Sequence, residues 1–233
     1  MWGRIRLALA VLLAPFVLAF VYESCLFVVS NLKFYLASFV TYGFLVYAII
    51  YLFISRFRIG FFETLEHEFG HAAAGVFLGM GIRGLLVRPK EEDSELVAWE
   101  GETKLVGHGC YSVARLTPYC IPLLSIPLVA IRLFVLPSVE GVIDFLIGFS
   151  LAFHVVALIR EFRFYQPDIK DTGRLFSLNL VSMINTFVLV AVPLLVCGDY
   201  SSISNYLKQS VVKGVEVYRT IYEIWKALDD VSS

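Results

Sequence analysis

Long apolar runs separated by short charged segments are the feature that most constrains this chain of 233 residues. An α-helix needs about 20 consecutive apolar residues to cross the hydrocarbon core of a bilayer. Six runs reach or approach that length, and they cover residues 7–29, 34–54, 61–80, 113–136, 142–159 and 175–196. The sequence therefore predicts an integral membrane protein whose chain crosses the bilayer several times.

The composition supports the same class of protein. Hydrophobic residues make up 58% of the chain and charged residues only 17%, whereas a soluble domain carries about 25% charged residues. The net charge of −1 gives no electrostatic basis for binding nucleic acid. The lipid bilayer is the partner that this composition predicts, and nucleic acid is not expected as a partner.

We expect an all-α polytopic membrane protein with about six transmembrane helices and one small β insertion. Short apolar segments around a charged turn predict two or three strands near 82–88, 95–99 and 103–107, between the third and fourth helices. Apolar residues at helical spacing predict a C-terminal amphipathic helix over about 205–228, lying on the membrane surface or against the helix bundle.

These elements divide the chain into three consecutive segments. Residues 1–58 contain two transmembrane helices, residues 59–198 contain four with the β insertion at about 82–107, and residues 199–233 form the tail. The fourth run carries Pro118, Pro122 and Pro127. Proline frees backbone carbonyls, so this helix is expected to be kinked or broken where protein or a polar cavity satisfies them.

The run at 61–80 is apolar at its flanks but contains His67-Glu68-Phe69-Gly70-His71, which has the pattern H-E-x-x-H. Residues i and i+4 of a helix lie on one face, so His67 and His71 can bind one zinc ion while Glu68 is angled toward a zinc-bound water. Ionisable residues are costly within a membrane, which favours a functional explanation for this cluster. Small residues such as Gly70 and Gly75 permit neighbouring elements to approach this helix closely.

A catalytic zinc ion usually has three protein ligands and one open position. The sequence offers several candidates for the third ligand in or beside apolar runs: His108, Asp144, His154, Glu161, Asp168 and Asp171. The last two follow Pro167 and are expected to begin the sixth transmembrane helix. Capping of that helix by an aspartate is the alternative explanation for both.

The chain resembles the site-2 proteases, a family of intramembrane zinc metalloproteases, over roughly residues 60–196. The resemblance is carried by the motif in an apolar helix, a following β-like segment, a proline-bearing helix, and an aspartate at a loop-to-helix junction about 100 residues later. It implies that His67, His71 and an Asp bind zinc, that Glu68 is the catalytic base, and that a membrane-embedded peptide bond is cut. No PDZ-like insertion is present, as in a minimal, divergent member.

The second motif of the family is usually Asp-Gly preceded by Asn and Pro, and this chain departs from it. Gln166-Pro167-Asp168 has the preceding proline, and Asp171-Thr172-Gly173 has the nearby glycine. We favour Asp168 as the third ligand, with Asp171 as the alternative. His154 is expected to lie behind the ligands or in the substrate pocket, or to be a histidine hydrogen-bonded between helices.

The expected function is hydrolysis of peptide bonds in or near transmembrane segments of membrane proteins, with water activated by zinc and Glu68. An edge strand near 82–106 would present the substrate in an extended form, and Thr64, Glu66 and the 160–174 loop would line a polar cleft. Two alternatives are a membrane zinc protease of the prenyl-processing or quality-control type, with Glu161 as third ligand, and a non-catalytic membrane scaffold.

Overall fold

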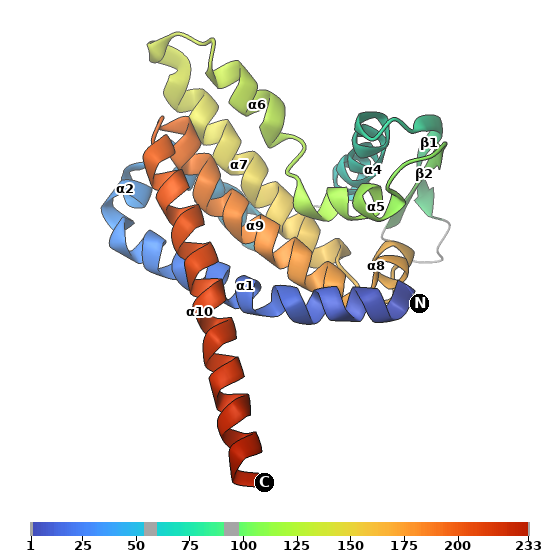
Figure 1. Ribbon diagram of the computed structural model, residues 1–233. Coiled ribbons are helices and arrows are strands. Elements are labelled where there is room, and N and C mark those ends of the chain that lie inside the picture. Colours follow the sequence, from blue (N-terminus) through green and yellow to red (C-terminus); the bar gives the residue numbers. More distant parts are fainter. Residues whose placement is uncertain (1, 54–59, 91–97, 233) are drawn as a thin grey trace. The chain divides into compact units, whose positions relative to one another are not determined.

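Helices predominate in the computed structural model (Figure 1), which describes residues 2–53, 60–90 and 98–232. The predicted boundary between residues 58 and 59 lies outside the described residues. The elements are, in chain order, α1 (Trp2–Ser30), α2 (Leu32–Ala37), α3 (Phe39–Phe53), α4 (Gly60–Phe77), β1 (Gly81–Lys90), β2 (Ala98–Val106), α5 (Tyr111–Cys120), α6 (Ser125–Arg132), α7 (Pro137–Glu161), α8 (Pro167–Thr172), α9 (Arg174–Val196) and α10 (Tyr200–Ser232).

The chain forms two compact units, Met1–Leu36 with Gly173–Ser233, and Ala37–Thr172. In the first unit α9 and α10 pack against α1. Its core contains Phe20, Val190, Leu194 and Tyr206. One pair of polar side chains within these apolar helices meets inside the unit: the Tyr206 and Ser24 hydroxyl oxygens lie 2.6 Å apart. Pairing offsets the cost of burying these two hydroxyls.

The C-terminal helix α10 is longer than the predicted 205–228, and its two halves differ. In the first half Gly214 lies against the ring of Phe16, and the Tyr218 hydroxyl donates a hydrogen bond to the Leu12 carbonyl at 2.7 Å. Between residues 221 and 228 the large apolar side chains are exposed, and this end of the helix extends away from α1 and α9 (Figure 1). The first half therefore packs against the helices of its own unit, one of the two predicted placements.

In the second unit α3 and α7 cross at very short range. A methyl group added to Gly43 would collide with the Phe145 carbonyl, and one added to Gly148 would collide with the Val40 carbonyl. Glycine at both positions lets the two backbones touch, as is common between helices in membranes. Tyr47 fills the next part of the contact with its ring against Phe149 and Phe153.

The predicted β insertion forms one antiparallel hairpin. β1 pairs with β2 in a register that places Gly81 opposite Val106 and Val87 opposite Gly101. The described part of the predicted strand 95–99 joins the strand predicted at 103–107, so that both belong to β2; residues 91–97 lie outside the described residues. The hairpin packs against α4 through both of its strands.

Three helices are long and apolar enough to cross a membrane: Gly3–Ser30, Pro137–Glu161 and Arg174–Val196. A fourth span is formed if α5 and α6 are taken together, although a bend of 71° separates them. The bend follows from Pro122, which lies in the break between the two helices. The run at 34–54 is also divided, between α2 and α3 at Ser38, and α3 alone has only 15 residues. The described chain thus supports a membrane protein with three or four such spans.

Candidate metal centre

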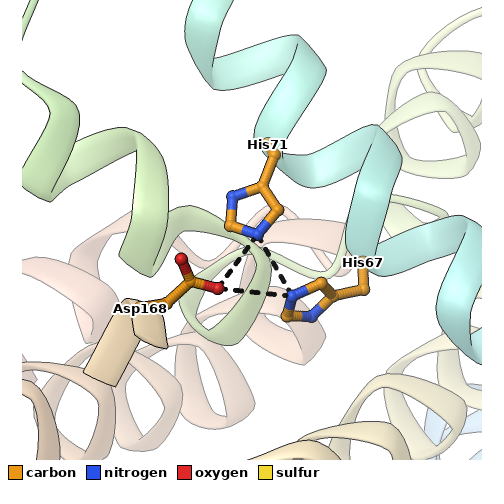
Figure 2. A group of neighbouring side chains, drawn as sticks. All are labelled: His67, His71 and Asp168. Carbon is orange, nitrogen blue, oxygen red and sulfur yellow. Dashed lines mark hydrogen bonds and ion pairs between the residues drawn. The ribbon is translucent and has the colours of Figure 1, made fainter. Parts of the chain in front are cut away.

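The two motif histidines lie one turn apart on α4 and point to the same place (Figure 2). Their Nε2 atoms are 3.1 Å apart. The Nδ1 atom of His71 lies 3.0 Å from the Ala114 carbonyl oxygen. Because a carbonyl only accepts hydrogen bonds, Nδ1 carries the proton, and the lone pair of His71 is on Nε2, the atom that faces His67.

Asp168 on α8 provides a third donor at the same place (Figure 2). Its Oδ2 atom lies 3.3 Å from Nε2 of His71 and 3.9 Å from Nε2 of His67. Zinc binds N and O ligands at about 2.0–2.2 Å with tetrahedral angles, which separates two ligands by about 3.3–3.6 Å. The observed separations of 3.1, 3.3 and 3.9 Å lie around that range, so the three residues fit one zinc ion.

Among the described residues, His67, His71 and Asp168 are the group of His, Cys, Asp and Glu side chains whose ligand atoms lie close enough to hold a metal. The Asp168 carboxyl is mostly buried. Burial by itself would raise its pKa, but hydrogen bonds and ion pairing with His67 and His71 in their protonated form outweigh this effect and hold the pKa of Asp168 well below its usual range. The carboxyl is therefore ionised at neutral pH, as a metal ligand must be.

The two aspartates do not begin the long helix that follows, which corrects the sequence prediction. They lie on the separate short helix α8, and Gly173 stands between α8 and α9. Gly173 has a φ of 105°, a left-handed conformation that only glycine adopts easily and that interrupts the helix. The residue at the N-cap of α9 is Gly173 itself, so neither aspartate caps that helix.

Helix α5 holds both sides of the cluster in place. Ala114 accepts the hydrogen bond of His71, and the ring of Tyr119 lies edge-to-face against His67 with centroids 4.9 Å apart. The Tyr119 hydroxyl donates to the Gln166 side chain at 2.7 Å, immediately before α8. Arg115 donates to Asp171 at 2.6 Å. Contacts behind the ligands of this kind orient them and tune metal affinity.

The other candidates for the third ligand lie elsewhere. Asp171 is paired with Arg115, and Asp144 accepts a hydrogen bond from Arg132 at 2.6 Å. Glu161 lies 3.5 Å from the Gln166 amide nitrogen. His108 is exposed after β2, and His154 is buried on α7, where it lines a small cavity with Glu66 and Glu161.

The motif glutamate faces the hairpin. Glu68 is buried, and its Oε2 atom accepts a hydrogen bond of 2.6 Å from the Thr103 hydroxyl on β2. Sequence reasoning did not single out Thr103, Arg115 or Tyr119, because each acts through a partner far away in the chain. Only the alternation of residues along β2 offered a signal, since residues 101, 103 and 105 point to one face of the strand.

An open cleft of about 840 Å³ borders the cluster. One wall is β2, and the other walls come from α4, α5 and the start of α8. Both signs of charge are present along it: Arg83, Glu100, Glu102, Lys104, Arg115 and Glu161. Such side chains keep water in the cleft. Thr64 lines the cleft as expected, whereas Glu66 is buried with Oε1 3.5 Å from the Leu124 amide at the break between α5 and α6.

Comparison of the chain with protein-family models, with curated proteins and with solved structures finds no match in any of the three. The residues of the cluster and their geometry are therefore the basis for a functional proposal.

Proposed function

We propose that this protein is an intramembrane zinc metalloprotease similar to the site-2 proteases. The observation that carries the proposal is the convergence of two imidazole nitrogens and one carboxylate oxygen, with separations that suit zinc, next to the buried Glu68. Two nitrogens and one oxygen are the donor set typical of catalytic zinc sites, which keep a fourth position open. The ligands also border a cleft that water and a peptide can enter.

The chemistry follows from these parts. A zinc ion held there polarises a carbonyl group and lowers the pKa of a water molecule. Glu68 accepts the proton of the attacking water and passes it to the leaving amine, first as base and then as acid. His71 keeps its Nε2 lone pair directed at the site through its bond with Ala114. Asp168 supplies the negative charge that offsets part of the charge of the cation.

The substrate in this proposal is a transmembrane segment that unwinds locally. A peptide bond in a helix is hydrogen-bonded and shielded, so an extended form is needed at the site. β2 pairs with β1 on one side only among the described residues, and residues 99–106 line the cleft. An extended peptide can add to such an edge through main-chain hydrogen bonds.

We also propose that the chain crosses the bilayer six times, with α3 and α4 as further membrane segments. α3 packs closely against α7, which is itself long and apolar enough to span a membrane. α4 is 18 residues long, and four of its five ionisable side chains are buried: Glu63, Glu66, Glu68 and His71. Burial removes them from the surface that lipid would contact, which is the usual arrangement of such residues.

Two other functions predict different results. In a prenyl-processing or quality-control type of protease, Glu161 would be the third ligand, although its described partner is Gln166. A non-catalytic scaffold would keep the cluster without turnover. Zinc content tests the first alternative, and a cleavage assay tests the second.

Metal content of the full chain purified in detergent is the first measurement. We expect about one zinc ion per chain in the native protein and loss of zinc in His67→Ala and Asp168→Ala. Asp171→Ala and Glu161→Gln should retain zinc. The matched aspartates Asp168 and Asp171 control for each other, because they lie one turn apart on α8. Zinc retained in Asp168→Ala and lost in Glu161→Gln would favour the alternative protease.

Cleavage is the second measurement, with a reporter whose single apolar transmembrane segment is interrupted by Gly-Gly, reconstituted with the protein in vesicles. The native protein should cut this Gly-Gly reporter. Glu68→Gln should bind zinc normally and fail to cut, because an amide cannot take the proton. Equal cleavage by the native protein and Glu68→Gln would contradict the proposed mechanism, and no cleavage by either would favour the scaffold.

A further inference from the structure

The face of β2 that packs against α4 has side chains whose sizes fit the residues opposite them on the helix. Residues 101, 103 and 105 share this face because side chains alternate along a strand. A methyl group added to Gly101 would collide with the Glu68 side chain, and one added to Gly75 would collide with Leu105. The strand therefore has its smallest residue opposite the glutamate, and the helix has a glycine opposite the leucine two turns later.

Thr103 lies between these two contacts on β2 and makes a hydrogen bond to Glu68. Its hydroxyl lies 2.6 Å from Oε2 of Glu68 and 3.1 Å from the Glu68 backbone carbonyl oxygen. A hydroxyl has one proton, and the shorter distance assigns it to the carboxylate. The bond engages Oε2 of the carboxylate and not Oε1. It also ties the glutamate of α4 to a strand that forms the wall of the cleft.

We infer that Thr103 is a positioning residue for Glu68, and that the hairpin places the catalytic base as well as bordering the substrate cleft. The inference rests on the proposed function, in which Glu68 takes a proton from water. A base must lie within about 2.6–3.2 Å of the atom that carries the proton it accepts, and small misplacements of a catalytic group reduce the rate strongly. Gly101 leaves room for the Glu68 side chain, and Thr103 supplies a hydrogen bond to its carboxylate. Together they fix the position of the carboxylate.

Binding of acetohydroxamate to the Co²⁺-loaded full chain in detergent tests this without any need for turnover. The visible absorption of Co²⁺ reports binding, and the probe needs a neighbouring base to take its hydroxyl proton. Thr103→Val, which keeps the shape and removes the hydroxyl, should retain Co²⁺ and bind acetohydroxamate about 10–100-fold more weakly. Thr103→Ser should restore most of the affinity. Thr220→Val, which removes a hydroxyl bonded to a carbonyl of α10, should have no effect.

Gly101→Ala should displace the same carboxylate by a steric collision and should also weaken acetohydroxamate binding. Gly84→Ala is its matched control on β1, because nothing lies within 4 Å of a methyl group added there. On the Gly-Gly reporter, Thr103→Val should lower kcat and leave KM within about twofold, the pattern of an interaction made in the transition state. In acetohydroxamate binding, the double variant Glu68→Gln with Thr103→Val should bind no more weakly than Glu68→Gln alone.

Three results would overturn the inference: unchanged acetohydroxamate affinity in Thr103→Val, loss of Co²⁺ in that variant, or full additivity in the double variant. The last two would mean that Thr103 supports the fold or the ligands rather than Glu68. If the native protein leaves the reporter uncut while Thr103→Val and Glu68→Gln both weaken acetohydroxamate, the protease proposal fails and the positioning role stands.

Discussion

Single side chains decide whether the three ligands meet at one point. The spacing of His67 and His71 is local, and each ring is then fixed by a contact from α5. His71 is oriented by the Ala114 carbonyl, and His67 lies against the ring of Tyr119. Tyr119 also makes a second contact: its hydroxyl donates a hydrogen bond to the Gln166 side chain, just before the helix that carries Asp168. One side chain thus supports ligands from two distant parts of the chain.

Tyr119→Phe separates the ring contact with His67 from the hydrogen bond to Gln166. The ring against His67 is kept, while the hydrogen bond to Gln166 is lost and the start of α8 is less restrained. A hydrogen bond contributes about 0.5–1.5 kcal/mol net, so we expect zinc affinity to fall about two- to tenfold. Competition with a chromophoric chelator measures it. Tyr111→Phe is the control, since that hydroxyl bonds the Gly107 carbonyl, which precedes α5, and not Gln166. An equal loss in both variants would contradict the role of the Tyr119 bond.

What the sequence could reveal at this scale was limited to local spacing. An i, i+4 pair of histidines is visible in five residues, because helical geometry alone brings it together. The choice between Asp168 and Asp171 depends on how α8 is turned, and that is set by Tyr119, Arg115 and the left-handed Gly173. Thr103 was invisible for the same reason: its partner lies 35 residues earlier, and no local pattern links a strand threonine to a helix glutamate.

Among the elements, the close packing of helices in the second unit depends on the positions of small residues. The apolar runs indicated the helices well, but two of the runs are broken, at Ser38 and between residues 120 and 125. Hydropathy carries no information on such breaks, because apolar residues continue through them. The expected close approach to α4 is confirmed at Gly70, which lies against Pro118 of α5. The sequence analysis did not single out Gly43 and Gly148, which bring α3 and α7 into backbone contact.

Gly148→Ala should therefore destabilise the second unit. The added methyl group meets the Val40 carbonyl, and a backbone cannot move aside as a side chain can. Overpacking typically costs about 1–3 kcal/mol, and we expect this variant at the upper end or beyond. Thermal unfolding in detergent measures the loss. Gly141→Ala lies on the same helix against the ring of Phe39 at 3.1 Å, and because a ring can shift, its effect should be small. Equal melting temperatures for both variants would contradict the close crossing.

For the whole molecule, the compact units group segments that are far apart in sequence. α1 packs with α9 and α10, while His67, His71 and Asp168 and the residues of α5 that contact them lie within Ala37–Thr172. The three predicted segments followed chain order, since nothing in the composition links the first helix to the last two. Within the second unit, α4 and α8 carry the candidate ligands, which are about 100 residues apart, so a bound ion would connect these helices directly.

Zinc should therefore stabilise the folded chain, and the zinc-dependent increase in the free energy of unfolding should depend on the three ligands. The unfolded chain has no preformed site, so zinc at 100 times its Kd adds about 2.7 kcal/mol to the free energy of unfolding. For a chain of this size that corresponds to a rise in Tm of about 5–10 °C. Removing zinc with a chelator should reverse the rise.

The dependence on named residues makes this measurement specific. Asp168→Ala should show no zinc-dependent rise in Tm, whereas Asp171→Ala should show nearly the full rise, because its carboxylate bonds Arg115 rather than the cluster. Mg²⁺ should not replace zinc, since it prefers six oxygen ligands over imidazole nitrogen. A rise that persists in Asp168→Ala would mean that the ion binds elsewhere, and the three converging side chains would then need a different explanation.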